Sequence, residues 1–147
     1  MSLELRLLLL AALVLVAVAA GLWFKSRNGR AKTIRSGQRV SLSALAAVKD
    51  GRPVTKFGKK ITFLQFSSEM CSQCATTART LRDLELRGDG VLHIEVDITN
   101  RLDLAKKFSI LQTPTTLVLD AQGRITSRIG GAARAQTLRE EIGLFEI

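Results

Sequence analysis

Cysteine and histidine are scarce in this chain of 147 residues, which holds two cysteines and one histidine. A complete zinc site would need carboxylates beside the two thiols and His93, because zinc takes four ligands in structural sites. We therefore expect no bound metal and no cofactor. His93 is expected on a partly exposed face of a strand. The chemistry of the chain then depends on its two cysteines.

Acidic residues are absent from the stretch that carries most of the excess positive charge. The chain has 22 Lys and Arg against 13 Asp and Glu, a formal net charge of +9. Much of this excess comes from six basic residues: Lys25, Arg27, Arg30, Lys32, Arg35 and Arg39. No aromatic residues are interleaved with a basic face, so the pattern does not favour nucleic-acid binding. It indicates a basic segment close to anionic lipid headgroups.

Charged residues are also missing from Leu7–Phe24, a run of apolar residues that follows a short N-terminal flank (1–6). A helix of this length spans roughly 27 Å, enough for the core of a bilayer. Trp23 and Phe24 stand at its end, where interfacial aromatics are found. We predict a retained transmembrane anchor over 7–24; the alternative is a signal peptide cleaved at Ala17-Val18-Ala19. No cysteine comes directly after the run, which excludes a lipoprotein anchor.

The orientation of this anchor follows from the basic residues on its two sides. Before the run stand only Arg6 and the N-terminal amine, whereas the basic residues from Lys25 to Arg35 follow it. The positive-inside rule then places the C-terminal domain (41–147) in the cytoplasm, with 25–40 as a basic juxtamembrane linker that acts as a tether. The alternative is a solvated linker on the other side of the membrane.

The two cysteines lie at C-x-x-C spacing in Phe63–Cys74, FLQFSSEMCSQC. This stretch indicates an apolar strand, a short turn, and then Cys71 and Cys74, separated by Ser72 and Gln73, at the start of a helix. Thiols three positions apart can close a small disulfide loop there, and a helix N-terminus favours a thiolate on the first sulfur. The pattern predicts a redox-active pair.

The rest of the chain predicts alternating strands and helices. A short helix from Ser41 to Val48 and a loop over Arg52–Lys60 come first. From residue 61 the predicted order is β-α-β-α-β-β-α, an α/β domain with a central mixed sheet flanked by helices. Its elements are strand Ile61–Phe66, helix Cys71–Arg87, strand Val91–Ile98, a helix capped by Asn100, antiparallel strands Thr116–Leu119 and Arg124–Ile129, and a last helix with Leu138, Ile142 and Phe145 inside and Glu140 and Glu141 on its solvated face.

Three motifs in this order resemble the thioredoxin fold: FLQFSSEMCSQC, DLAKKFSILQTPTT and TLVLDAQGRITSRIGG. The resemblance covers about residues 41–147 and, with the anchor, is to membrane-tethered bacterial thioredoxin-like proteins. It implies a thiol–disulfide oxidoreductase that acts on protein thiols and disulfides, including an upstream redox partner, with Cys71 attacking and Cys74 resolving. It also implies a cis bond between Thr113 and Pro114, where the exposed backbone of Thr113 pairs with an incoming peptide strand.

The sequence departs from thioredoxin close to the cysteines. Met70 stands where a tryptophan usually precedes the first cysteine, and Ser72-Gln73 replaces Gly-Pro between the two. These changes leave the direction open: the chain reduces, oxidises or isomerises its substrates. Gln65 replaces the buried acid of the first strand and cannot take a proton. Glu95, on the neighbouring strand where thioredoxin carries a lysine, is then the candidate general base for Cys74; the alternative is a Glu95 that points to solvent.

Two other function classes stay open beside the oxidoreductase. A copper-delivery or assembly module would use the two thiols as soft ligands, but it generally needs a third ligand, and His93 lies on the wrong kind of segment. A redox-inert interaction domain would use the scaffold alone. The presence of both cysteines argues against that second alternative, although a fold by itself never proves an activity.

Overall fold

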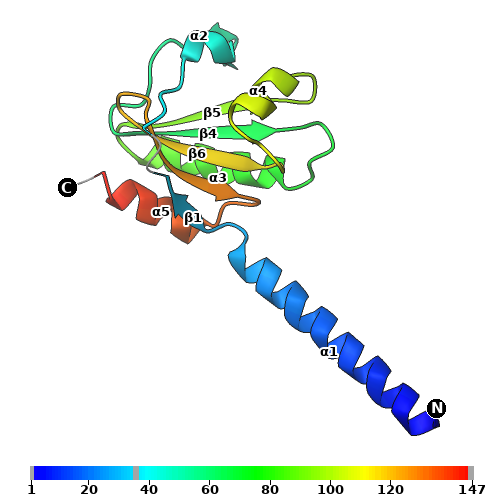
Figure 1. Ribbon diagram of the computed structural model, residues 1–147. Helices are drawn as coiled ribbons and strands as arrows, with labels where there is room; N and C mark the ends of the chain where they lie inside the picture. The colour runs from blue at the N-terminus through cyan, green and yellow to red at the C-terminus, as the bar shows by residue number, and fades with distance from the viewer. Residues whose placement is uncertain (1, 35–36, 146–147) are drawn as a thin grey trace.

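A long N-terminal helix leads into a five-stranded sheet that carries helices on both faces (Figure 1). The structure, a computed structural model, describes residues 2–34 and 37–145, so Arg35 of the predicted basic run lies outside the described residues. The helices are α1 (Leu3–Arg27), α2 (Leu42–Leu45), α3 (Cys74–Arg87), α4 (Leu102–Lys107) and α5 (Ala135–Gly143). The strands are β1 (Ala31–Thr33), β2 (Val48–Lys49), β3 (Arg52–Pro53), β4 (Ile61–Ser67), β5 (Val91–Asp97), β6 (Thr115–Asp120) and β7 (Ile125–Gly130).

The main sheet has the strand order β1-β7-β6-β4-β5. β4 pairs with β5 in parallel, through the crossover helix α3, while the β4–β6, β6–β7 and β1–β7 pairs are antiparallel. This confirms the predicted mixed sheet and the order β-α-β-α-β-β-α from residue 61. β4 is buried along its whole length, as expected for a central strand covered on both faces.

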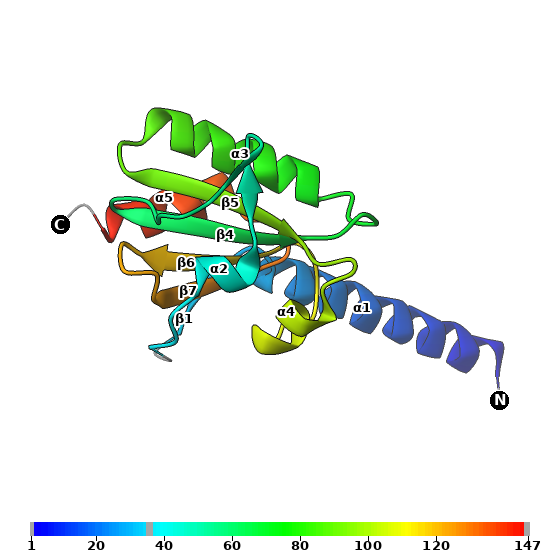
Figure 2. The ribbon, with the colours of Figure 1, turned by 90° about the horizontal axis from the view of Figure 1, so that it is seen from above.

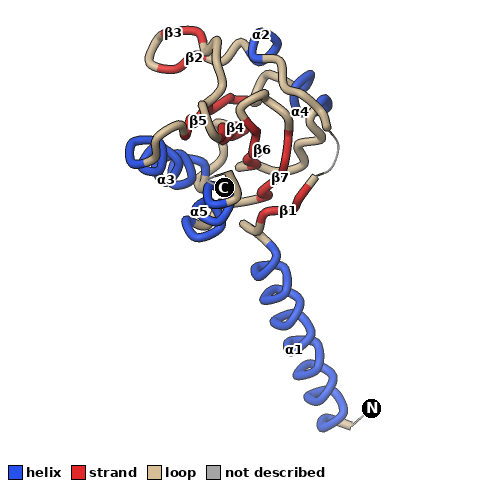
Figure 3. The backbone as a smooth tube through the Cα atoms, turned by 90° about the vertical axis from the view of Figure 1, so that its left-hand side faces the viewer, coloured by secondary structure: helices blue, strands red, loops and turns tan. Residues whose placement is uncertain are grey.

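Two apolar clusters pack the helices onto the two faces of the sheet. Figure 3 shows the resulting layers, with α3 and α5 on one side and α2 and α4 on the other. Alternate residues of each strand point to opposite faces. Leu64 and Phe66 therefore join the cluster under α2 and α4, while Ile61 and Phe63 join the cluster under α3 and α5. The predicted inner side of the last helix is confirmed, because Leu138, Ile142 and Phe145 all contact the second cluster.

Helix α1 has no buried residue and stands clear of the domain (Figure 1). It is capped by Ser2, whose hydroxyl accepts from the backbone of Leu5, and it runs longer than the predicted apolar span. Among residues 2–34 and 37–145 it is the one helix long and apolar enough to cross a membrane. A signal sequence near an N-terminus has the same length and composition, so α1 fits either sequence interpretation.

The segment expected to be a tether contributes a strand to the sheet. Within 25–40, residues Ala31–Thr33 form β1 and pair with β7, with Ala31 opposite Ile129. Part of the predicted tether is therefore a strand of the sheet. Only three residues separate the last residue of α1 from the first residue of β1. The helix and the domain are joined by a short connection.

Three shorter elements differ from prediction for local reasons. Helix α2 ends at Leu45 instead of Val48, because Ala46 adopts a left-handed conformation with φ +50°. Val48–Lys49 and Arg52–Pro53 then form a small hairpin around Asp50 and Gly51, both at positive φ, as a type I′ turn requires. Arg101, not the predicted Asn100, stands at the N-cap of α4, and its side chain makes no capping bond there.

Candidate functional site

Cys71 and Cys74 form a disulfide at the N-terminus of α3. The helix was predicted from Cys71, but it begins at Cys74; Cys71 lies in the preceding turn, with its carbonyl accepting from the Cys74 N–H at 3.3 Å. Cys71 is half-buried, and Ser72 and Gln73 are exposed, whereas Cys74 is only 4% exposed. Cys71 is therefore the more accessible residue of the pair.

The loop before Cys71 is held by hydrogen bonds to the end of β5. The Glu69 N–H donates to the Thr99 hydroxyl at 3.0 Å, and the Ile98 N–H donates to the Ser67 carbonyl at 2.9 Å. The Cys71 N–H in turn donates to the Ser68 carbonyl at 3.1 Å. These bonds fix the backbone that presents Cys71, while the adjacent Met70 side chain is left 96% exposed.

The Thr113–Pro114 loop lies against this cysteine loop, as the sequence predicts. The peptide bond between the two residues is cis. The hydroxyls of Thr113 and Ser68 share a hydrogen bond of 2.9 Å, and the Pro114 carbonyl accepts from the Gly131 N–H at 2.8 Å. Thr113 is half-buried and Pro114 is buried, so Thr113, the residue predicted to pair with a peptide, is the more accessible of the two.

A buried chain of hydrogen bonds runs from the second cysteine into the sheet. The Gln65 side-chain amide donates to the Cys74 carbonyl at 3.0 Å, and its Oε1 lies 3.1 Å from His93 Nε2. Because the amide nitrogen faces the Cys74 carbonyl, Oε1 accepts and His93 Nε2 donates. Gln65, predicted to replace a buried acid, is fully buried and therefore acts as a bridge between Cys74 and His93.

The prediction of a partly exposed His93 is wrong, because the residue is only 3% exposed. Burial, together with the positive charges of Lys49 and Arg82, lowers the pKa of His93 from 6.5 to about 4. The ring is therefore neutral at physiological pH, with its Nε2 proton held by Gln65. Leu92 and Ile94 lie on the opposite face of β5, so the alternation along the strand places His93 on the face that α3 covers.

Strand β5 is an edge strand, so it has no neighbouring strand on one side. On that side, the backbone N–H and carbonyl of His93 form hydrogen bonds with side chains. Its N–H donates to Glu85 Oε1 at 3.2 Å, and its carbonyl accepts from Lys49 Nζ at 2.9 Å. Lys49 and Glu85 form an ion pair with each other. The two side chains therefore cap the edge strand and fix the position of His93 from outside the sheet.

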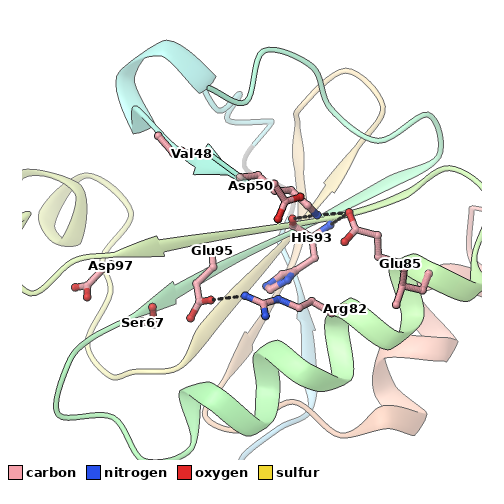
Figure 4. Close-up of a pocket in the computed structure, with 10 residues that line it drawn as sticks. Val48, Asp50, Ser67, Arg82, Glu85, His93, Glu95 and Asp97 are labelled. Carbon is pink, nitrogen blue, oxygen red and sulfur yellow. Dashed lines mark hydrogen bonds and ion pairs between the residues drawn. The ribbon is translucent and has the colours of Figure 1, made fainter. Parts of the chain in front are cut away.

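Glu95 lies on the same face of the sheet as Gln65, because the two residues are register partners in the parallel pair of β4 and β5. Its side chain is 32% exposed, and its carboxylate lies 3.9 Å from the Arg82 guanidinium of α3. Figure 4 shows Glu95 and Arg82 pointing toward each other across a cleft that His93 also lines. The Glu95 carboxylate thus lies in a partly solvated ion pair.

Other polar groups on the α3 and α5 side of the sheet are buried as well. The hydroxyls of Thr77, one turn after Cys74, and of Thr116, opposite Gln65, are buried and have no hydrogen-bond partner within the described part of the chain. Glu141 was expected on a solvated face, yet it is 8% exposed and accepts from the Ser127 hydroxyl at 2.5 Å. The burial of these groups depends on contacts between segments far apart in the sequence. No local motif therefore indicates it.

No group of three or more His, Cys, Asp and Glu side chains in 2–34 and 37–145 is arranged to hold a metal ion. A copper module would need His93 as its third ligand, but His93 Nε2 donates to the Oε1 atom of Gln65, between the sheet and α3. The arrangement around Cys71 and Cys74 is that of a cysteine pair able to exchange thiols and a disulfide.

Solved thioredoxins have the same fold as this chain. Spinach chloroplast thioredoxin F (short form) is 23% identical, with 61% of this chain and 80% of the spinach chain covered at a TM-score of 0.54. A point mutant of the thioredoxin from Halobacterium salinarum is 17% identical, with 59% of this chain and 75% of that chain covered at 0.52. The reduced thioredoxin pre-protein of Schistosoma mansoni is 22% identical, with 60% of this chain and 81% of that chain covered at 0.50.

A sequence comparison identifies the family directly. No curated protein matches the chain in sequence. The family profile described as the thioredoxin-like domain, however, matches residues 52–145, which is more than half of the chain and includes both cysteines and the cis-proline loop. The chain therefore belongs to the thioredoxin-like domain family, and its disulfide supports a role of the thiol–disulfide oxidoreductase type.

Proposed function

We propose that the chain is a membrane-anchored thiol–disulfide oxidoreductase in which Cys71 exchanges with partner proteins and Cys74 resolves the intermediate. The observation that carries the proposal is the unequal access to the two sulfurs: Cys71 is half-buried beside the exposed residues Met70 and Ser72, whereas Cys74 is covered. A bulky protein disulfide reaches the first sulfur and not the second. Thr113, beside the cysteine loop, is the supporting residue that would align the partner's backbone.

The exchange balances as two successive displacements at sulfur. In the reducing direction the Cys71 thiolate attacks one sulfur of the partner disulfide, which forms a mixed disulfide and releases the first partner thiolate. Cys74 then loses its proton and attacks the Cys71 sulfur, which releases the second partner thiolate and closes the Cys71–Cys74 disulfide. Two electrons pass to the partner, whose thiolates are protonated by solvent. The oxidising direction is the reverse of these steps.

Trapping experiments test the division of labour. The Cys74→Ser variant should accumulate mixed disulfides with partner proteins, because the resolving thiol is missing. The Cys71→Ser variant is the matched control and should trap none. Mixed disulfides are counted on non-reducing gels after rapid acid quenching. Equal trapping by the two variants would remove the assignment, and the midpoint potential of the pair against glutathione would then establish whether the disulfide exchanges at all.

Glu95 is our candidate for the group that accepts the Cys74 proton during resolution. Its register with Gln65 on the α3 side of the sheet supports the proposal, and Gln65 itself has no acid–base function. In the Glu95→Gln variant, resolution of a preformed Cys71 mixed disulfide should slow by about tenfold at neutral pH, while initial attack barely changes. Arg82→Gln is the control, since it removes the ion-pair partner and keeps the carboxylate. Unchanged rates for Glu95→Gln from about pH 6 to 9 would exclude the role.

The basic residues at and after the end of α1 support a cytoplasmic domain. Lys25 and Arg27 lie in the last turn of α1, Arg30 and Lys32 follow it, and cytoplasmic flanks of membrane spans carry such excess charge. A thiol reagent that cannot cross membranes should therefore miss Cys71 in intact cells, after mild reduction of the disulfide, and should label it once the cells are permeabilised. Labelling of intact cells would place the domain on the outer side.

A further inference from the structure

The connection between α1 and the domain is anchored on both sides by hydrogen bonds. The Gly29 N–H donates to the Gly130 carbonyl at 2.9 Å, directly after the helix ends at Arg27. The Arg134 guanidinium donates to the Lys25 carbonyl at 3.2 Å, within the last turn of α1. Strand pairing with β7 begins at Ala31. No free length of chain is left between the helix and the sheet.

The connection is also sterically tight at Gly29. Its φ is +76°, a conformation that favours glycine, and a Cβ at this position would lie 2.4 Å from the Ala132 carbonyl oxygen. The side chain of Asn28 lies against Gly131, which directly precedes Ala132 in the sequence. A side chain larger than hydrogen at residue 29 would therefore force α1 away from the domain. The connection acts as a fixed joint, in contrast to a flexible linker.

This joint lies at the same end of the domain as the disulfide. Gly131, beside Asn28, donates to the Pro114 carbonyl; the neighbouring Thr113 shares a hydrogen bond with Ser68, whose carbonyl accepts from Cys71. Figures 1 and 2 agree with this path: in both views α1 leaves the domain toward the side where β4 ends and the loop to α3 begins. The β6–β7 turn lies at the other end of the strands.

The end of α1 carries the features of a membrane–water interface. Trp23 and Phe24 are exposed, and the Arg27 guanidinium stacks over the Trp23 ring at 4.4 Å. Aromatic and basic side chains of this kind mark the headgroup level of a membrane span. Since Gly29 follows within two residues of Arg27, the joint, and with it the cysteine end of the domain, lies next to the headgroups when α1 spans a bilayer.

Two exposed apolar side chains lie on the loops at this end. Met70 precedes Cys71, and Leu111 stands on the loop that leads to Thr113; each is 96% exposed. The Leu111 loop is held in place, because the Arg128 guanidinium, on the strand that pairs with β1, donates to the Ser109 carbonyl at 2.9 Å. Exposed apolar side chains on the loops at the cysteine end, held beside headgroups, fit an apolar partner segment better than they fit water.

We infer that the joint between α1 and β7 is a positioning device that presents Cys71 to a cysteine pair lying next to the bilayer in an integral membrane protein. The inference rests on the proposed exchange at Cys71 and adds its substrate class. Met70 and Leu111 would contact the apolar residues where the partner leaves the membrane. The electron transfer is the two-step exchange given above, with the membrane partner's disulfide as the acceptor or its dithiol as the donor.

The geometry can be tested without any exchange activity. The full-length protein with Cys71→Ser and Cys74→Ser receives one new thiol, at Leu111→Cys or, as the control, at Gln122→Cys in the β6–β7 turn. Each is labelled with a fluorophore and reconstituted in vesicles of phosphatidylcholine and phosphatidylglycerol that contain a nitroxide on the headgroup. The label at residue 111 should be quenched at least about threefold more than the label at 122. Equal quenching would overturn the inference.

The substrate class is tested with a synthetic transmembrane peptide that carries a disulfide-bonded cysteine pair directly after its span. The Cys74→Ser protein is compared with the same protein carrying a flexible insertion of about six Gly and Ser residues between Asn28 and Gly29. An identical insertion after Gly51 is the control, because this hairpin glycine is exposed and a Cβ added to it would meet no atom within 4 Å. Mixed-disulfide formation in the vesicles should slow at least about fivefold only for the first insertion, because the fixed orientation is lost.

Insulin, a soluble disulfide substrate, separates this inference from the proposed function. Both insertion variants should attack insulin at the rate of the uninserted protein. If all three proteins attack the membrane peptide equally, the positioning role is wrong although the exchange chemistry stands. If none attacks either substrate, the exchange at Cys71 itself is wrong, and the quenching result alone then describes the joint.

Discussion

The two faces of the same sheet differ in what they bury. The face under α2 and α4 is apolar except at the strand ends, where Thr62 and Thr115 are satisfied by nearby backbone groups. The face under α3 and α5 buries Gln65, His93 and Thr116 among apolar residues. Buried polar groups cost stability unless they are hydrogen-bonded. Their concentration beside Cys74 therefore indicates that one face stabilises the fold and the other adjusts the site.

The largest expected effect comes from the apolar face. Phe66 is fully buried, with its ring 5.4 Å from that of Phe108. Phe66→Ala leaves a cavity, and the free energy of unfolding should fall by about 3–5 kcal/mol. Urea unfolding of the full-length protein in detergent micelles, followed by circular dichroism, measures it. Met70→Ala is the control, because that side chain is exposed, and should change stability little. A loss below about 1 kcal/mol for Phe66→Ala would mean that this face does not dominate stability.

The fold was predictable because its helices and strands carry regular apolar spacing. Leu81 and Leu138 mark the inner sides of α3 and α5, and the strands from residue 61 are apolar runs bounded by turns. Strand β1 was missed because Ala31–Thr33 pairs with β7 through its backbone, and such pairing leaves no hydrophobic pattern in the sequence. The small hairpin around Asp50 and Gly51 differs from the sequence expectation, which has a helix to Val48 and a loop from Arg52.

The site was predictable only where residues adjoin in the sequence. Cys71 and Cys74 are marked by their spacing, and Pro114 by its place before a strand. His93 is different: whether its side of β5 is exposed depends on where α3 lies, and its hydrogen bond to Gln65 joins residues 28 positions apart. Local patterns determine neither of these facts. The buried polar chain therefore had to be seen in three dimensions.

A second prediction concerns a substitution that replaces a polar side chain of the α3 face with an apolar one. In the Gln65→Leu variant, His93 Nε2 loses its acceptor and the Cys74 carbonyl loses its side-chain donor. Leaving the buried Nε2–H of His93 unpaired should lower the free energy of unfolding by about 1–3 kcal/mol. The midpoint potential of the Cys71/Cys74 pair should shift as well, because the Gln65 amide no longer donates to the Cys74 carbonyl. Gln65→Glu is the matched variant, since it keeps an acceptor for His93. An unchanged potential in Gln65→Leu would mean that the hydrogen bonds of Gln65 have only a structural role.

The smallest expected effect is a dependence of stability on pH that comes from His93. Its pKa is about 4 in the folded protein and near 6.5 when unfolded, so the unfolded chain binds more protons between these values. Stability is therefore complete above pH 6.5 and is lost as the pH falls toward 4. From about pH 7.5 to 5.5 the free energy of unfolding should drop by about 1.3 kcal/mol. His93 is the only histidine, so His93→Gln should make urea unfolding nearly independent of pH in this range. If both proteins show the same slope, His93 is not held neutral, and the polar face does not favour an uncharged ring beside Gln65.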